Sequence, residues 1–180
     1  MVERTREFAK RFDRAYRIHQ QAIHAYLYAR SEDSALAEDL MQEVFARAWA
    51  RFGDLAPLDD DQQRNWLFAV AKNSLVSELR RKHVRSKRLS ATWFDLRFPD
   101  NSAAHWETSD SVRRLERLIG QLPEDQRTAL VLQVVGGLTS PQIAAVLERP
   151  AGTVRYLIST ARSELARKLS HDEDDPHDRR

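Results

Sequence analysis

The sequence contains no cysteine and only five glycines and six prolines among 180 residues. Without cysteine, the chain has neither a disulfide framework nor a thiolate metal site. Scarce glycine and proline, together with abundant alanine, leucine, arginine and glutamate, favour a helical protein. The amino-terminal stretch MVERTREFAKRFDR has no apolar run, so we expect neither a signal peptide nor a membrane anchor there. The length suits one compact domain or two small ones.

The motifs that mark common enzyme classes are also missing. The six histidines are scattered, and none belongs to an HExxH zinc motif. No glycine-rich phosphate loop occurs, and no Ser-His-Asp order has a supporting motif. We therefore expect a protein that is not an enzyme, with no metal site and no cofactor.

The net charge of +2 conceals two segments of opposite charge. Residues 31–61 carry nine acidic side chains against Arg47 and Arg51, whereas residues 78–88 carry six basic side chains against Glu78 alone. Separated charges of this kind indicate two surfaces that meet different partners. From charge alone, a solvated face on each segment explains the pattern equally well.

Apolar residues in steps of three and four predict three helices in the amino-terminal half. The first has an apolar stripe at Phe8, Phe12, Tyr16, His19, Ile23, Tyr26 and Leu27. Ser34 is expected to cap the second helix and Gly53 to end it. The stripe of this second helix consists of Leu36, Leu40, Val44, Ala48 and Phe52. A polar loop over 54–63 leads into a third helix from about Gln62 to Val84.

Periodicity disappears over residues 89–110, which we interpret as a linker. Its aromatic residues indicate that it docks on something, and they are Trp93, Phe94, Phe98 and Trp106. A second helical block follows, in which Gly120 and Pro123 separate the first two helices. The polar tail over 171–180 is expected to be disordered.

The segment LTSPQIAAVLERPAGTVRYLISTARSELARKL has the spacing of a helix-turn-helix. Thr153 is expected to cap the last helix, which would run to about Leu169. Inward packing is expected for Val154, Leu157, Ile158, Ala161 and Leu165. The side chains left facing outward are Arg155, Tyr156, Ser159 and Arg162. Arginine and tyrosine there suit base edges and phosphates in a major groove, although a plain helical hairpin has a similar pattern.

Three segments carry a family resemblance. They are AEDLMQEVFARAWARF (37–52), RNWLFAVAKNSLVSELRRK (64–82) and LTSPQIAAVLERPAGTV (138–154). In this order they resemble bacterial sigma factors of the extracytoplasmic-function group of the sigma-70 family. The resemblance implies an all-α fold with two small helical domains. These are a region 2 bundle over 8–88 and a region 4 helix-turn-helix over 111–170, joined by the irregular linker.

The resemblance also implies partners for each segment. It assigns binding of the coiled coil of the core polymerase β′ subunit to Asp39, Gln42, Glu43 and Phe45. It assigns binding of the −10 promoter element, duplex and melted, to Trp66, Asn73, Arg80, Arg81 and Lys82. Trp66 is either a stacking wedge or a core aromatic. It assigns binding of the −35 element to Thr153, Arg155, Tyr156, Ser159 and Arg162.

The resulting expectation is an alternative sigma factor that works in the cytoplasm with core RNA polymerase and promoter DNA. The family further implies an anti-sigma factor as a partner. The chain departs from the family pattern at Ser77, Leu157 and Thr160, where the family commonly has Asp, Arg and Arg. Fewer cations at the −35 element favour either weak intrinsic binding there or an unusual −35 sequence that is read partly through Tyr156. The alternatives are a sigma-like interaction protein and a stand-alone helix-turn-helix regulator.

Overall fold

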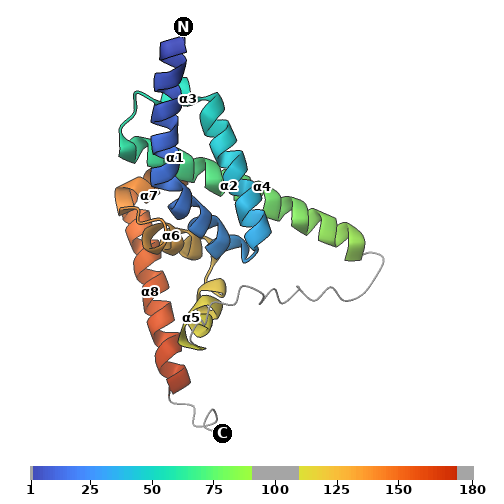
Figure 1. The fold of residues 1–180 in the computed structure, drawn as a ribbon. Helices are drawn as coiled ribbons and strands as arrows, with labels where there is room; N and C mark the ends of the chain where they lie inside the picture. Colours follow the sequence, from blue (N-terminus) through green and yellow to red (C-terminus); the bar gives the residue numbers. More distant parts are fainter. Residues whose placement is uncertain (1, 91–109, 174–180) are drawn as a thin grey trace. The chain divides into compact units, whose positions relative to one another are not determined.

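The structure, a computed structural model, describes residues 2–90 and 110–173, with side chains for 6–82 and 114–170. Every regular element within these ranges is an α-helix, which confirms the all-α prediction (Figure 1). The chain divides into two compact units, residues 1–101 and 102–180. Most of the expected linker over 89–110 and of the tail over 171–180 lies outside the described residues.

The first unit contains α1 (Val2–Ser31), α2 (Ser34–Ala50), the short α3 (Phe52–Leu55) and α4 (Asp60–Ser90). Helices α1, α2 and α4 each pack against the other two. The largest side chains at their centre are fully buried, and they include Tyr26, Phe68, Ile23, Leu27, Leu75 and Val44. The helical stripes read from the sequence therefore form this core, because one apolar face of each helix meets the other two.

Aromatic rings extend this core along α1. The Phe12 ring makes edge-to-face contacts with Trp49 at 4.9 Å and with Phe52 at 5.2 Å between ring centroids. Tyr16 meets Phe45 in the same manner at 4.6 Å. Such pairs add to the free energy gained from burial alone, by roughly 0.5–1.5 kcal/mol each. The amino-terminal half of α1 is thereby fixed to the carboxyl-terminal half of α2.

Both ends of α2 differ from the prediction. Asp33, not Ser34, is the N-cap residue, and its Oδ1 accepts a hydrogen bond from the Leu36 backbone N–H at 3.0 Å. The extended backbone of Asp33 suits a cap, whereas Ser34 already lies in the helix. Gly53 does not end α2, because the helix stops at Ala50 and Gly53 lies within α3.

Helix α4 begins earlier and ends later than the predicted range of 62–84. The Asp59 carboxylate accepts the Gln62 backbone N–H at 2.7 Å, and the Gln62 side-chain oxygen accepts the Asp59 backbone N–H at 3.2 Å. This reciprocal cap satisfies two backbone donors and starts the helix at Asp60. The polar loop predicted over 54–63 is thus reduced to residues 56–59.

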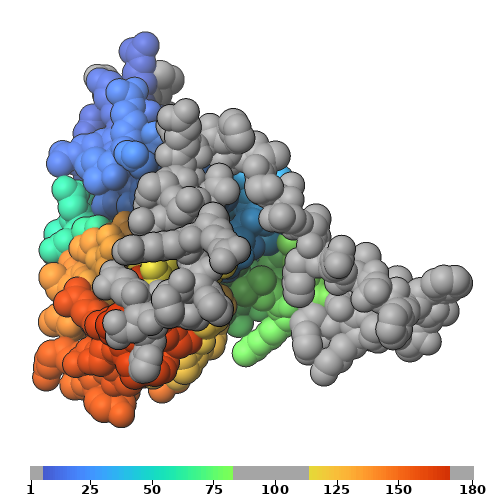
Figure 2. Space-filling view, turned by 90° about the horizontal axis from the view of Figure 1, so that it is seen from below, coloured from blue at the N-terminus to red at the C-terminus, as the bar shows by residue number. Residues whose placement is uncertain are grey.

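The second unit contains α5 (Asp110–Gly120), α6 (Glu124–Val134), α7 (Ser140–Leu147) and α8 (Ala151–Glu173). Helix α8, orange to red in Figure 2, packs against α5, α6 and α7. Its core residues Val154, Ile158, Ala161 and Leu165 are buried as predicted, while Leu157 is half-buried. At the far end of α8, an Arg114 guanidinium nitrogen donates to the Leu169 carbonyl at 3.2 Å and ties α5 to this helix.

The turn between α7 and α8 is tighter than predicted. Glu148 closes α7 in the left-handed region with a φ of 53°, and the Arg149 backbone N–H reaches the Ala144 carbonyl at 3.0 Å. Helix α8 starts at Ala151, so Thr153 lies inside its first turn and does not cap it. A side chain with a Cβ at such a φ is strained, which is why glycine usually occupies this position.

A buried histidine lies on the core face of α1. His19 is 4% exposed, and its Nε2 has no hydrogen-bond partner among the described residues. Burial, reinforced by the positive charge of Arg64, lowers the pKa of His19, while Asp60 acts in the opposite direction. The imidazole is therefore held in its neutral form inside the first unit.

Replacing the strained Glu148 by glycine is expected to stabilise the second unit. Glu148→Gly relieves a left-handed penalty of about 1–2 kcal/mol, part of which is offset by the greater backbone freedom of glycine in the unfolded chain. We expect a net gain of about 0.5–1 kcal/mol. Calorimetry of the full chain measures it as a rise in the melting temperature of that unit. Glu148→Ala retains the strained φ and should bring no gain; an equal gain would show that the backbone strain is not responsible.

Protonation of His19 is expected to destabilise the first unit in mild acid. As pH falls below the usual histidine pKa of 6.5, the unfolded chain binds a proton that the folded chain resists. Stability is therefore complete above that pH and falls below it, by at most about 1.4 kcal/mol per pH unit. Urea unfolding followed by tryptophan fluorescence at pH 7 and 5.5 measures the loss. His19→Leu should flatten this dependence, and an unchanged dependence in that variant would show that another group is responsible.

Candidate functional site

The exposed face of α2 carries the carboxylates that the sequence assigned to polymerase binding. Asp39 and Gln42 are exposed, and Glu43 is half-exposed, with an ion pair to Arg47 one turn further along the helix. Residues three and four apart in a helix are neighbours on its surface, so the three side chains form one polar patch. This patch, Asp39, Gln42 and Glu43, is called the acidic patch below.

Phe45, predicted to be part of the same contact, lies elsewhere. It is 5% exposed, and its ring packs against Tyr16 and Phe12 of α1. A ring so covered packs α2 against α1 and leaves little of its own surface for a partner, and its assignment to polymerase binding stays a prediction. Trp49 is instead 47% exposed, seven residues after Gln42 and hence on the same side of α2. Its ring also packs against Phe8 and Phe12 of α1, so only part of its surface faces outward.

Helix α4 divides lengthwise into a core side and an exposed side. Leu67, Phe68, Ala71 and Leu75 are buried against α1 and α2. Trp66, Asn73 and Arg80 follow one another at intervals of seven residues, which places them together on another side of the helix. Asn73 and Arg80 are exposed, whereas Trp66 is half-buried. Trp66 thus has part of its surface in the packing and part available for contact.

The three described cations at the end of α4 differ in their surroundings. Arg81 lies 3.1 Å from the Glu78 carboxylate, and the Lys82 ammonium lies 3.1 Å from Asp33 Oδ2. Arg80 makes no ion pair among the described residues. The hydrogen bond from the Leu36 backbone, and then the contact with Lys82, lower the pKa of Asp33, so its carboxylate stays charged at neutral pH. Among the cations at this end whose side chains the structure describes, one guanidinium is therefore free and two charges are paired.

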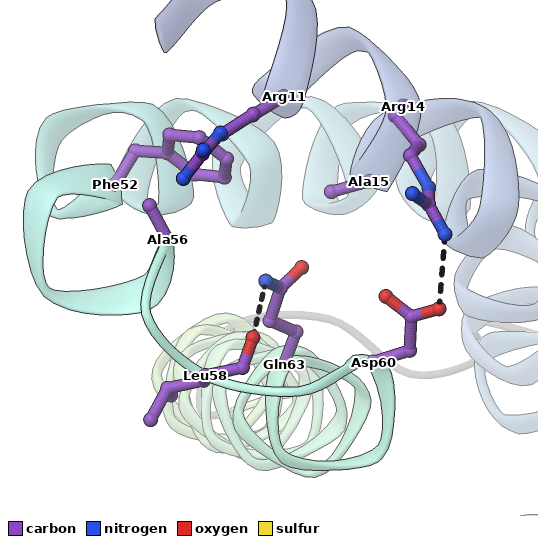
Figure 3. A pocket seen from close by; sticks show the side chains of 8 residues that line it. All are labelled: Arg11, Arg14, Ala15, Phe52, Ala56, Leu58, Asp60 and Gln63. Atoms are coloured by element: carbon purple, nitrogen blue, oxygen red, sulfur yellow. Dashed lines mark hydrogen bonds and ion pairs between the residues drawn. The ribbon is translucent and has the colours of Figure 1, made fainter.

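A cavity of about 290 Å³, lined by polar and apolar side chains alike, lies between α1 and the turn that leads into α4 (Figure 3). Arg11 and Arg14 come from α1, and an Arg14 guanidinium nitrogen lies 3.5 Å from the Asp60 carboxylate. Gln63 donates to the Leu58 carbonyl at 3.0 Å from the opposite side. The aspartates of this turn are consequently engaged within the protein, apart from Asp61, whose side chain has no partner among the described residues.

The outward side of α8 matches the helix-turn-helix prediction. Arg155, Tyr156, Ser159 and Arg162 are all exposed, and Tyr156 keeps 68% of its surface free. The Arg162 guanidinium donates to the Gln133 side chain of α6 at 3.0 Å, which fixes its position. Thr153 is half-buried in the first turn. This side of the helix offers two guanidinium groups, a phenol and a hydroxyl to a polar partner.

Helix α7 is held in place before α8 by its own cap. The Thr139 backbone N–H and hydroxyl both donate to the Gln142 side-chain oxygen, at 2.7 and 2.9 Å. Arg149 in the following turn donates to the Asp125 carboxylate of α6 at 2.8 Å. The cap at its start and the Arg149 contact just after its end thus hold α7 within its own unit.

Comparison with known proteins identifies both units. The family described as "Sigma-70 region 2" matches residues 15–85, and the family described as "Sigma-70, region 4" matches residues 112–165. The RNA polymerase sigma-H factor of Pseudomonas aeruginosa is 31% identical, with 94% of this chain and 92% of that protein covered. The ECF RNA polymerase sigma-E factor of Escherichia coli is 28% identical over the same shares of the two chains.

A solved structure shows the same fold. The sigma factor RpoE of Bartonella quintana, crystallised with the anti-sigma factor NepR, has a TM-score of 0.69 and 23% identity. The match covers 88% of this chain and 96% of that one. Within residues 2–90 and 110–173, no helix combines the length and apolarity needed to cross a membrane. The same residues contain no cluster of three or more metal-ligating side chains.

Both families occur in the chain in the expected order, and a relative above 30% identity spans nearly its whole length. Sigma factors are regulatory proteins that bind core RNA polymerase and promoter DNA. The protein belongs to the extracytoplasmic-function group of the sigma-70 family and is an alternative sigma factor that directs promoter-specific initiation of transcription.

Proposed function

We propose that the acidic patch of α2 is the surface that binds core RNA polymerase, by gripping a basic helical segment of the β′ subunit. The observation that carries this proposal is the separation of charge within the first unit. Helix α2 exposes carboxylates, while the end of α4 exposes cations. A basic partner is attracted to the first surface and repelled by the second, which fixes its position.

The second part of the proposal concerns the −10 element. Arg80, Arg81 and Lys82 contact phosphates next to the melted segment, and Asn73 reads a base edge or a phosphate. The exposed part of Trp66 stacks on an unpaired base, since an aromatic ring replaces the neighbour that a base loses on leaving the duplex. Asn73 and Arg80 lie on the same side of α4 as Trp66, which supports their action on a single strand.

The third part concerns the −35 element. Arg155, Tyr156, Ser159 and Arg162 enter a major groove with the first turns of α8, and Thr153 lies near the adjacent phosphate. Arg162 already bonds to Gln133, and half-buried Leu157 contributes no charge. We therefore propose weak binding by this unit alone. Affinity for a promoter would come from both units acting on one DNA molecule.

The same proposal covers the cellular setting of the protein. It acts in the cytoplasm, where polymerase and chromosome are found, and it has no catalytic activity of its own, because the polymerase performs the chemistry. An anti-sigma factor is a further candidate partner, as the family resemblance implies. Run-off transcription with core polymerase distinguishes a working sigma factor from an interaction protein that binds polymerase without reading promoters.

Reversing charge on the acidic patch is expected to weaken polymerase binding. Asp39→Lys and Glu43→Lys together place two cations against a basic partner, and we expect at least a tenfold loss of affinity for purified core polymerase. Titration of labelled protein with core enzyme measures it. Asp54→Lys combined with Asp61→Lys is the matched control, because it reverses two exposed carboxylates of the same unit that lie outside α2. Equal losses for the two double variants would mean that only overall charge matters.

Removing Arg155 is expected to impair recognition of the −35 element. Arg155→Ala deletes a base or phosphate contact, which should lower promoter affinity by about tenfold and reduce run-off transcription with it. Promoters would be taken from genome-wide mapping of sites bound together with polymerase. Arg167→Ala is the control, since Arg167 is an exposed cation of the same helix that pairs with Glu164. A defect as large for Arg167 would contradict a specific role for Arg155.

A further inference from the structure

Asp33 uses its two carboxylate oxygens for two different purposes. Oδ1 accepts the Leu36 backbone N–H at 3.0 Å and caps α2, the helix that carries the acidic patch. Oδ2 accepts the Lys82 ammonium at 3.1 Å, and Lys82 belongs to the cationic end of α4. The two residues are 49 positions apart in sequence. One carboxylate thus joins the start of the polymerase-binding helix to the end of the DNA-binding helix.

The position of Asp33 is itself constrained. The Asp33 backbone N–H donates to the Ser31 hydroxyl oxygen at 3.3 Å, and that hydroxyl donates to the Asp33 carbonyl at 3.1 Å. Glu32 between them has a left-handed φ of 55°. With its backbone held on both sides and one oxygen occupied by the cap, Asp33 presents its second oxygen to Lys82 in a fixed direction.

The ion pair is accessible to a competing anion. The side chains of Asp33 and Lys82 are 35% and 48% exposed, so a phosphate can approach the ammonium from solvent. Lysine binds such groups as a point charge on a flexible stem and exchanges one anion for another without a demanding geometry. A phosphate that binds the Lys82 ammonium must nevertheless displace Asp33 from it or share it with Asp33. This competition lowers the affinity of Lys82 for every phosphate by the same factor.

We propose that Asp33 is a restraining residue that competes for Lys82 and so lowers the affinity of the protein for DNA in general. The inference rests on the proposed contact of Lys82 with promoter DNA. A promoter complex has further contacts that offset this cost. Random DNA has fewer of them, so the same loss of affinity leaves less random DNA bound.

Asp33→Asn isolates this role from the cap. Asparagine caps helices about as well as aspartate, so the start of α2 is preserved while the charge facing Lys82 is removed. Asp33→Ser serves as a second variant that keeps a capping oxygen, should the first fail to fold. Glu32→Gln is the matched control, because Glu32 is an exposed carboxylate one residue away that makes no ion pair among the described residues.

The experiment titrates fluorescent single-stranded DNA of random sequence with the full chain and follows anisotropy at several salt concentrations. We expect Asp33→Asn to bind about two- to fivefold more tightly, which is the effect of releasing one partly exposed ion pair. The dependence of log affinity on log salt should steepen by about 0.7, the value for one additional phosphate contact on a single strand. Glu32→Gln should stay close to the unaltered protein in both respects.

Lys82→Gln, alone and combined with Asp33→Asn, completes the test. We expect Lys82→Gln alone to weaken binding. In the double variant, the gain in affinity from Asp33→Asn should fall to less than half, because the Lys82 charge that Asp33 restrains is gone. If Lys82→Gln weakens binding but Asp33→Asn brings no gain, the restraint proposed here is wrong. If Lys82→Gln has no effect at all, the contact of Lys82 with DNA is wrong, and that part of the proposed function fails with it.

Discussion

The continuity of α4 is the constraint on which the first unit depends. One unbroken helix from Asp60 to Ser90 is buried over its first half, through residues such as Phe68 and Leu75, and carries cations toward its end. Because the buried half is packed against both α1 and α2, the direction of the cationic half is fixed without further support. A rigid element of this kind positions charged side chains more accurately than a loop would.

The charge pattern follows from which sides of the helices remain uncovered. The apolar stripes of α1, α2 and α4 are buried in the core. The side chains left exposed are acidic on α2 and basic at the end of α4. The two surfaces approach each other at Asp33 and Lys82, where an ion pair joins them. Opposite charges in one small unit allow two partners of opposite charge to bind together, since each is excluded from the other's surface.

Helices and core residues could be predicted from the sequence because their periodicity is local. The stripe through Ile23 and Leu27 and the buried side of α8 are examples, and both are present in the structure. The helix ends were predicted less well. Ser34 and Thr153 have side chains suited to a cap, but the backbone of the preceding turn decides which residue takes that role. The burial of Phe45 could not be predicted from the sequence of α2 alone, because the rings that cover it belong to α1, nearly thirty residues earlier.

The same distinction between local and distant contacts decides how much of the functional surface a sequence can reveal. The exposed row of α8 follows from helix spacing, and so does the row through Asn73 and Arg80 on α4. The partners of individual charges cannot be predicted from helix spacing, because Lys82 contacts Asp33 and Arg162 contacts Gln133 only after folding. A count of cations in the sequence therefore overstates the charge that is free for DNA. The electrostatic attraction to a promoter depends on how many of these internal contacts the phosphates can replace.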